Sequence, residues 1–341
     1  MAQIIQSNSA QVNHQASALP LTTVSMVRNE ADIVEAFIRH HLCLVDRMVI
    51  ILHRPDVPNL LSDNTEEILE ELRAEGLPIE LTVFEEARYA QRELVTNAVR
   101  EAAKKQGEGW VLPLDADEFV VSPANIDLKD VLRSFDSSKA QQMPWRTYVP
   151  TENDDSLEAN PACRIQHRRV RETVRTNKII VPAKLAAHDR SKVSQGSHRF
   201  KISKDALNVE CDELSLAHIP IRTVQQIRTK VFHGWLNDLV HRYTTDDRVG
   251  VHWQRLYKEL SVSDSVTVAK LRDLALDYVS PGAPDEDRSL IHDPIATIDK
   301  KLRYERRPID PWAMLASDAE SMAKSLGIKK RNSFLPWRSS S

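Results

Sequence analysis

Four short apolar runs alternate with three amphipathic stretches over residues 21–115, and this alternation is the strongest constraint on the fold. The runs lie at Leu21–Val27, Met48–Leu52, Ile79–Phe84 and Trp110–Leu114. Between them, apolar residues recur three and four positions apart, which is typical of an amphipathic helix. Strands joined by helical crossovers form parallel sheets. The sequence therefore predicts an α/β fold with a mostly parallel, doubly wound sheet and helices on both faces.

Capping residues predict where two of these helices begin. Asn29 is expected to cap the first helix. A capping box of Asp63 with Glu66, or of Asn64 with Glu67, is expected to open the second helix.

The pattern loosens after about residue 140. Short strands are predicted at Met143–Val149, Ile179–Ala183 and Leu214–Ile219, followed by a helix at 223–240. From there to Leu326 the segments are helical and amphipathic, with a loop at 280–284. No segment approaches the ~20 apolar residues of a membrane helix. The first twenty residues also lack the basic start and apolar stretch of a secretory signal.

Composition excludes several classes of function. The 46 basic and 49 acidic residues give a net charge of −3, which offers no case for nucleic-acid binding. The three cysteines, Cys43, Cys163 and Cys211, form no C-x-x-C pair. They are expected to be reduced thiols of a cytosolic protein. With 8 glycines and no G-x-G-x-x-G or Walker sequence, a glycine-rich phosphate loop is not expected.

Three acids, Asp115, Asp117 and Glu118, directly follow the fourth apolar run. Buried unpaired charges are costly, so these acids should lie at the open end of the strand, where α/β sheets bind ligands. On an extended backbone, Asp115 and Asp117 would point to the same side and suit Mg²⁺ or Mn²⁺ that also holds phosphate oxygens. The alternative is a solvated turn with an acidic helix cap. Glu118 is interpreted as an outer-sphere ligand, a base or, preferably, a salt-bridge partner.

Taken together, the motifs resemble the family-2-like glycosyltransferases. Val27–Asp32 and Leu114–Phe119 are similar to two motifs of that family, the second in the branch with the sequence Leu-Asp-Ala-Asp-Glu-Phe. Further similar segments lie at Phe37–His41, 62–69, 91–97, 178–182, 196–198 and 217–222. The resemblance therefore covers roughly residues 21–240 in order.

The resemblance implies a GT-A (Rossmann-like) fold over residues 20–240, with a nucleotide-sugar half at 20–122 and an acceptor half at 123–240. A helical C-terminal region at 241–328 would follow, with a disordered leader at 1–19 and a basic tail at 329–341. The implied reaction is inverting, metal-dependent transfer of a sugar from a nucleotide-diphosphate sugar. The acceptor would be a glycan, a lipid-linked molecule or a small molecule. A cytoplasmic role in surface-polysaccharide synthesis is a reasonable context, with no nucleic acid and at most peripheral membrane contact through the tail.

The resemblance also implies site residues. Mn²⁺ or Mg²⁺ would bridge Asp117, with Asp115, to the donor diphosphate, and a late histidine, His198 or His218, would complete its shell. Each histidine has the alternative of a surface or satisfied core residue. Donor contacts are expected from Val27, Arg28, Asn29, Glu30, Asp63, Gln91, Asp115 and Lys178. For Val27–Glu30 the alternative is helix capping. Most of the basic stretch 164–178 is interpreted as solvated, with Lys178 as the exception.

The chain departs from the family pattern in two places. After the second strand, Asp56 and Asp63 are the candidates in place of the usual acidic residue. No Glu-Asp pair marks the catalytic base, so Glu118 and Glu172 are the candidates, in competition with Asp189, Glu210, Asp212 and Glu213. Two other functions stay open, a nucleotide-sugar-binding module without catalysis and a metal-dependent phosphatase. The phosphatase is disfavoured because the acidic pair lies on the fourth strand.

Overall fold

The computed structural model describes residues 19–54, 61–85, 90–122, 126–244, 251–261, 266–278, 288–296 and 301–325. The predicted leader apart from residue 19, Asp56, the loop at 280–284 and the tail at 329–341 lie outside the described residues.

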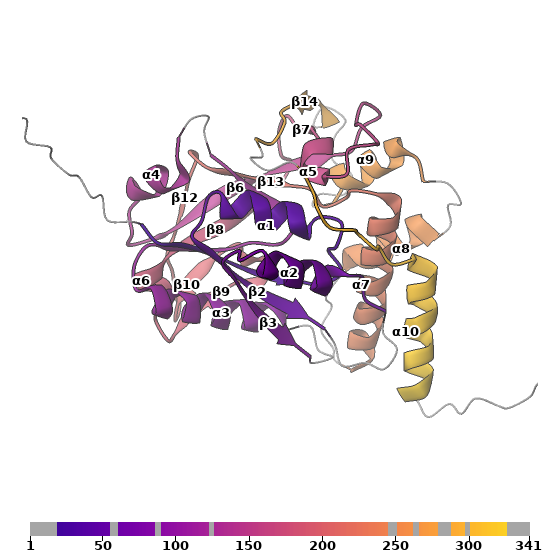
Figure 1. The fold of residues 1–341 in the computed structure, drawn as a ribbon, viewed down its shortest axis with the longest axis horizontal. Coiled ribbons are helices and arrows are strands. Elements are labelled where there is room, and N and C mark those ends of the chain that lie inside the picture. Colours follow the sequence, from indigo (N-terminus) through magenta and orange to yellow (C-terminus); the bar gives the residue numbers. More distant parts are fainter. Residues whose placement is uncertain are drawn as a thin grey trace, which may run out of the picture.

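The parallel sheet predicted from the first four apolar runs is confirmed. It contains β1 (Leu21–Val27), β2 (Arg47–His53), β3 (Ile79–Phe84) and β4 (Trp110–Pro113). The order is β4-β1-β2-β3, with every neighbouring pair parallel. This is one half of a doubly wound sheet, whose ligand crevice lies between the first and fourth strands. Figure 1 shows these strands in indigo and violet.

Helices cover both faces of this sheet, as predicted. Alternate residues of β1 and β2 enter two separate cores, since successive strand side chains point to opposite faces. One core joins β1 and β2 to α1 (Val34–Leu42) and α2 (Thr65–Ala74), and the other joins them to α3 (Gln91–Gln106). Coverage on both faces explains why the strands are continuously apolar in sequence.

Both capping predictions are wrong. Asn29 adopts a left-handed backbone (φ 53°), and α1 begins only at Val34, without a side-chain cap. The Asp63 carboxylate accepts hydrogen bonds from Ala31 and Thr65 and makes no capping box, and the Asn64 side chain does not cap α2. Asp63 and Asn29 join the turn after β1 to the loop before α2, and Asn64 bonds to Glu305 and Arg307.

The second half of the sheet is mixed, so the parallel pattern does not extend through it. β8 (Asn177–Pro182) runs antiparallel to β4 and to β6 (Ala140–Val149). β13 (Ser215–His218) pairs parallel with β6 and antiparallel with β5 (Glu118–Val121). The antiparallel strand β5 was not predicted.

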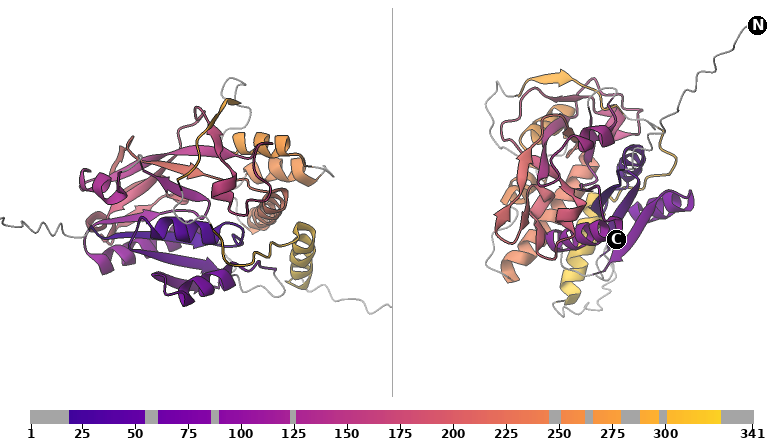
Figure 2. Two further views of the ribbon diagram at one scale, coloured as in Figure 1. Left: turned by 45° about the horizontal axis from the view of Figure 1, so that its top comes forward. Right: turned by 90° about the vertical axis from the view of Figure 1, so that its left-hand side faces the viewer.

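The remaining elements of this half are short. They are α4 (Leu128–Arg133), α5 (Pro161–Arg164), β7 (His167–Arg169), α6 (Ala183–Ala186), β9 (Ser191–Val193), η1 (Gln195–Ser197), β10 (Phe200–Ile202), β11 (Asp205–Ala206) and β12 (Asn208–Glu210). Strands β9, β10 and β11 form a separate small sheet, and β12 extends the main sheet beside β6. Figure 2 shows these magenta elements on one side of the indigo and violet strands.

The C-terminal region is mainly helical, as predicted. The helix predicted at 223–240 is α7 (Val224–Thr244), and α8 (Val251–Ser261), α9 (Val268–Leu276) and α10 (Pro311–Ser325) follow it in the region predicted as helical. These four helices share a third apolar core. One strand, β14 (Leu290–His292), interrupts the helices and pairs with β7. None of the helices in the described ranges is both long and apolar enough to cross a membrane.

An extended segment at 301–310, which we call the strap, ties this region to α1. The Glu35 carboxylate, 1% exposed, accepts hydrogen bonds from the backbone N–H groups of Arg303 (2.8 Å) and Tyr304 (3.1 Å). At the other end, the carbonyl of Ile309 accepts hydrogen bonds from Gln225 and Thr229 on α7. Figure 1 shows the strap as the yellow line that leads to α10.

Candidate active site

The turn after β1 is held by the loop before α2. The Asp63 carboxylate accepts a hydrogen bond from Ala31 N–H (2.9 Å), and the Thr65 hydroxyl accepts one from Glu30 N–H (2.9 Å). In return, the Asn29 side-chain oxygen accepts a hydrogen bond from Asp63 N–H (3.2 Å). These bonds fix the backbone from which the side chains of Glu30 and Asp32 project.

Arg222 lies at the centre of this end of the sheet. Its guanidinium is 0% exposed and pairs with Glu30 (2.5 Å) and Asp32 (2.6 Å). Burial alone would lower the pKa of Arg222, but the two carboxylates outweigh it and raise that pKa. Arg222 follows β13, so it joins the carboxyl end of β1 to the second half of the chain.

The first acid after β4 is anchored by a buried lysine. Lys178, 0% exposed on β8, contacts Asp115 (2.6 Å) and Glu118 (2.7 Å). Gln91 at the start of α3 donates a second hydrogen bond to Asp115 (3.1 Å). Glu118 also accepts a hydrogen bond from Asp115 N–H (2.8 Å). Burial raises the pKa of Glu118, and the Lys178 ammonium 2.7 Å away opposes this effect. Glu118 is therefore a buried salt-bridge partner, as the sequence favoured.

Asp117 has a different set of partners from Asp115. Its carboxylate, 6% exposed, lies 2.8 Å from the Lys230 ammonium, 3.8 Å from His218 Nε2 and 3.9 Å from Arg222. Burial would raise the pKa of Asp117, but Lys230, His218 and Arg222 together lower it. The backbone turns at Ala116–Asp117, so the extended backbone expected for the two aspartates is wrong.

Two histidines flank the indole of Trp145 on β6. His218 stacks on the ring (4.2 Å between centroids), and His198 meets it edge-on (5.3 Å). His198 Nδ1 is hydrogen-bonded to the carbonyl of Asn177 (2.7 Å), whereas the buried His218 Nδ1 has no hydrogen-bond partner among the described residues. Burial lowers the pKa of His218 to about 4 and also lowers the pKa of His198. Both imidazoles are therefore neutral near pH 7, the form that binds metals.

The predicted metal ligands are not gathered into one group. Within the described parts of the chain, no three His, Cys, Asp or Glu side chains are placed to hold a metal ion together. Asp117 and His218 face each other, whereas Asp115 is held by Lys178 and Gln91.

The competing base candidates lie at different places. Glu172 accepts hydrogen bonds from Thr147 N–H (2.6 Å) and its hydroxyl (2.8 Å). Thr147 is the ladder partner of His218, so Thr147 lies between Glu172 and that histidine. The four others make contacts outside the cluster. Asp189 pairs with Lys104, Glu210 and Asp212 pair with Arg175, and Glu213 accepts a hydrogen bond from the Cys211 thiol.

Two further donor candidates end β1. Val27 is buried at the last position of the strand and belongs to the core on the α1 face. Arg28 follows it and is partly buried.

Sequence reasoning missed Lys230, Arg222 and Asp32 as members of the site. Arg222 ends a segment similar to a family motif, and Asp32 ends another, so a signal existed for both. Lys230 lies on α7, where the helical pattern identifies the buried face but not the partner of a polar side chain.

Five carboxylates and three cations form this ion cluster, which leaves a formal charge of −2. Its members are Glu30, Asp32, Asp115, Asp117, Glu118, Lys178, Arg222 and Lys230. Burial raises the pKa of Glu30 to about 7, opposed by Arg222 and Lys230. With all eight groups ionised, the cluster would attract a cation and repel a diphosphate that arrived alone.

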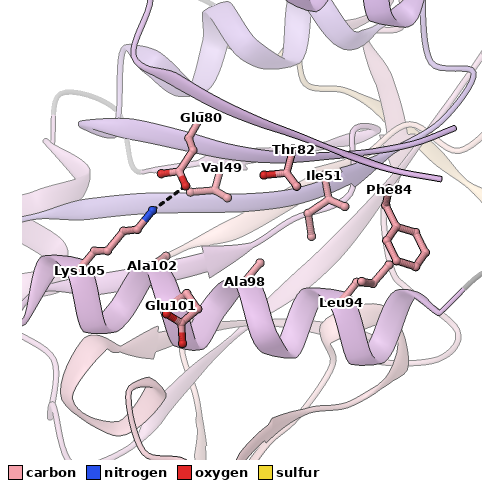
Figure 3. A pocket seen from close by; sticks show the side chains of 10 residues that line it. All are labelled: Val49, Ile51, Glu80, Thr82, Phe84, Leu94, Ala98, Glu101, Ala102 and Lys105. Atoms are coloured by element: carbon pink, nitrogen blue, oxygen red, sulfur yellow. Dashed lines mark hydrogen bonds and ion pairs between the residues drawn. The ribbon is translucent and has the colours of Figure 1, made fainter. Parts of the chain in front are cut away.

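A pocket of about 210 Å³ lies elsewhere, between β2, β3 and α3 (Figure 3). Its lining is largely apolar, with one ion pair between Glu80 and Lys105 (2.6 Å). None of the predicted site residues lines this pocket.

Comparison with known proteins gives distant structural similarities. No family model and no curated protein sequence matches the chain. The mannosyltransferase PcManGT from Pyrobaculum calidifontis, solved with GDP-Man and Mn²⁺, has a TM-score of 0.37 and 13% identity, covering 91% of this chain and 76% of its own. HddC from Yersinia pseudotuberculosis has a TM-score of 0.34 and 12% identity, covering 60% of this chain and 95% of its own.

A putative glucose-1-phosphate thymidylyltransferase from Bacillus anthracis, solved with a sucrose, has a TM-score of 0.32 and 8% identity. It covers 74% of this chain and 98% of its own. Similarity at this level assigns no activity, metal or substrate to the chain.

Proposed function

We propose that the chain is a transferase that binds a nucleotide-diphosphate sugar at the carboxyl ends of β1 and β4. The sugar would pass with inversion to an acceptor hydroxyl of a glycan, a lipid-linked molecule or a small molecule. The observation that carries this proposal is the ion cluster at the crevice between the two strands. Ligands of doubly wound sheets bind at such a crevice. The turn at 28–32, fixed by Asp63 and Thr65, would line one side of the donor site. Gln91 and Asp115 would line the other, with Lys178 buried behind Asp115.

The residues around Asp117 suit a divalent cation. Asp117 Oδ1 and His218 Nε2 lie 3.8 Å apart, which is too far for a hydrogen bond between them. The cluster has a formal charge of −2, and a carboxylate with a neutral imidazole is an ordinary donor set for Mn²⁺. Two protein ligands are enough, because Mg²⁺ sites usually take one or two carboxylates and complete the shell with water and substrate phosphate. Asp117 and His218 would contact the ion, and Asp115 and His198 would not.

When bound, the cation would neutralise charge that develops on the departing nucleoside diphosphate. The buried Lys178 would hold the carboxylates of Asp115 and Glu118 in place. Of the two base candidates, Glu118 is 0% exposed and held by Lys178, so we assign it a positioning role. Glu172 is partly exposed and bonded to Thr147, the ladder partner of His218, so we propose Glu172 as the base that takes the acceptor proton. A cytoplasmic role in surface-polysaccharide synthesis belongs to the same proposal.

Thermal unfolding with a panel of UDP-, GDP-, CMP- and dTDP-sugars, with and without Mn²⁺, tests the donor site. A ligand at a hundred times its Kd stabilises the fold by about 2.7 kcal/mol, which raises Tm by several degrees. The rise should need Mn²⁺, should occur with one nucleotide, and should be lost in Asp117→Asn. Asp189→Asn is the matched control, because that carboxylate is 85% exposed and pairs with Lys104 at the surface, outside the cluster.

No rise with any donor in the folded protein would overturn the proposal. Donor binding without hydrolysis or transfer would favour a nucleotide-sugar-binding module. Release of phosphate from simple monoesters would favour a phosphatase.

A further inference from the structure

We propose that the Lys230 ammonium pairs with the Asp117 carboxylate in the donor-free protein and that a divalent cation displaces it. The displaced ammonium would then pair with the donor diphosphate. This inference rests on the proposed function. It makes Lys230 a positioning residue that couples cation binding to donor binding.

Lys230 is the cation of the cluster with the most freedom to leave. Lys178 and Arg222 are both 0% exposed, and each holds two carboxylates at 2.7 Å or less. Lys230 is 26% exposed and has one short contact, to Asp117 at 2.8 Å, with Glu30 at 4.0 Å. A lysine ammonium is a point charge on a flexible four-carbon stem, so it can move without movement of α7.

Lys230 and a divalent cation compete for the same carboxylate. With Lys230 on Oδ2 and the cation on Oδ1, two positive charges would lie within a few ångströms. Like charges at such separations shift the binding of a charged ligand by about one to three powers of ten. Removing the Lys230 charge should therefore strengthen cation binding.

The displaced Lys230 ammonium is expected to pair with the bound diphosphate. The cluster alone has a formal charge of −2, so a diphosphate is repelled until a cation arrives. Once the cation holds Asp117, Lys230 remains beside it as the partly exposed ammonium of the cluster. Glu30, 4.0 Å from Lys230, is already paired with Arg222 at 2.5 Å, so we expect a bound diphosphate to be the stronger partner for the displaced ammonium.

Calorimetric titration of Mn²⁺ alone into the full chain tests the competition. Lys230→Met removes the charge and keeps the length of the side chain, and Lys230→Arg keeps the charge. Lys139→Met is the matched control, because Lys139 is exposed and lies before the first residue of β6, far along the strand from Thr147. We expect Lys230→Met to bind Mn²⁺ at least about tenfold more tightly. Wild type, Lys230→Arg and Lys139→Met should have similar, weaker affinities.

A second titration tests whether the displaced Lys230 pairs with a diphosphate. With saturating Mn²⁺, inorganic pyrophosphate should bind Lys230→Met about tenfold more weakly than the control. The two changes have opposite signs, so a general loss of structure in the variant cannot imitate both. Circular dichroism checks the fold, and Lys230→Gln replaces Lys230→Met if that variant is unfolded.

Mn²⁺ affinity that is unchanged or weaker in a folded charge-removing variant would overturn the inference. So would the absence of Mn²⁺ binding in both wild type and variant, which would make Lys230 a permanent counter-ion. If the Mn²⁺ and pyrophosphate results are as expected but no nucleotide sugar binds, the proposed function fails and the Lys230 competition stands.

Discussion

Lys178→Met should destabilise the fold severely. The wild-type ammonium is 0% exposed and contacts Asp115 at 2.6 Å and Glu118 at 2.7 Å. Removing one partner of a buried ion pair costs about 3–5 kcal/mol, because the other charge stays buried without compensation. Asp115 keeps Gln91 and is 34% exposed, whereas Glu118 is 0% exposed. Most of the loss should therefore come from Glu118.

Thermal unfolding measures the loss. For a chain of 341 residues, about 3–5 kcal/mol corresponds to a fall in Tm of about 4–7 °C. Glu118→Gln added to Lys178→Met should restore about 2 kcal/mol or more, since it removes the uncompensated charge. Lys139→Met serves again as the control, with a change within about 0.5 kcal/mol. A Lys178→Met variant within about 1 kcal/mol of wild type, or no recovery in the double variant, would refute the reasoning.

Three further results are expected. Glu172→Gln should lower the transfer rate about 10²–10⁴-fold and leave donor-induced stabilisation intact, and an unchanged rate excludes Glu172 as the base. Burial lowers the pKa of His40 from 6.5 to about 4. The unfolded chain therefore takes up a proton at His40 before the folded protein does, and stability is lost as the pH falls from 6.5 towards 4. His40→Gln, unlike exposed His188→Gln, should flatten that loss in acid-denaturation curves. Glu35→Gln should cost about 2–4 kcal/mol in unfolding experiments, against about zero for the 53%-exposed Glu70→Gln, and a smaller loss would mean that the strap does not depend on the Glu35 charge.

The four parallel strands were predictable because each is buried on both faces, and this makes the sequence continuously apolar. β5 was missed for the opposite reason. It has four residues and begins at Glu118, whose charge hides the strand in sequence but is neutralised by Lys178, 60 residues later in the chain. β14 is a three-residue strand that forms only because β7 lies beside it.

The end of the sheet where a site forms was also predictable, because charged residues directly after an apolar strand cannot be buried alone. The partners of those charges were not predictable from the sequence. Lys230 and Arg222 reach Asp117 from more than 100 residues away, and short-range periodicity carries no record of such contacts. Asn29 illustrates the same limit, since a residue typical of a helix cap is used to hold the loop of Asp63.

The strap has a consequence for the order in which the chain can mature during synthesis. Glu35 is synthesised early. The N–H groups of Arg303 and Tyr304, which donate hydrogen bonds to its carboxylate, follow 268 and 269 residues later. At about 5–20 residues per second, a ribosome needs roughly 13–55 s to supply them. During that interval α1 carries a carboxylate whose final partners do not yet exist, although Arg39 on the same helix already provides one. The N-terminal elements should therefore remain only partly protected from hydrogen exchange on the ribosome until the strap has emerged.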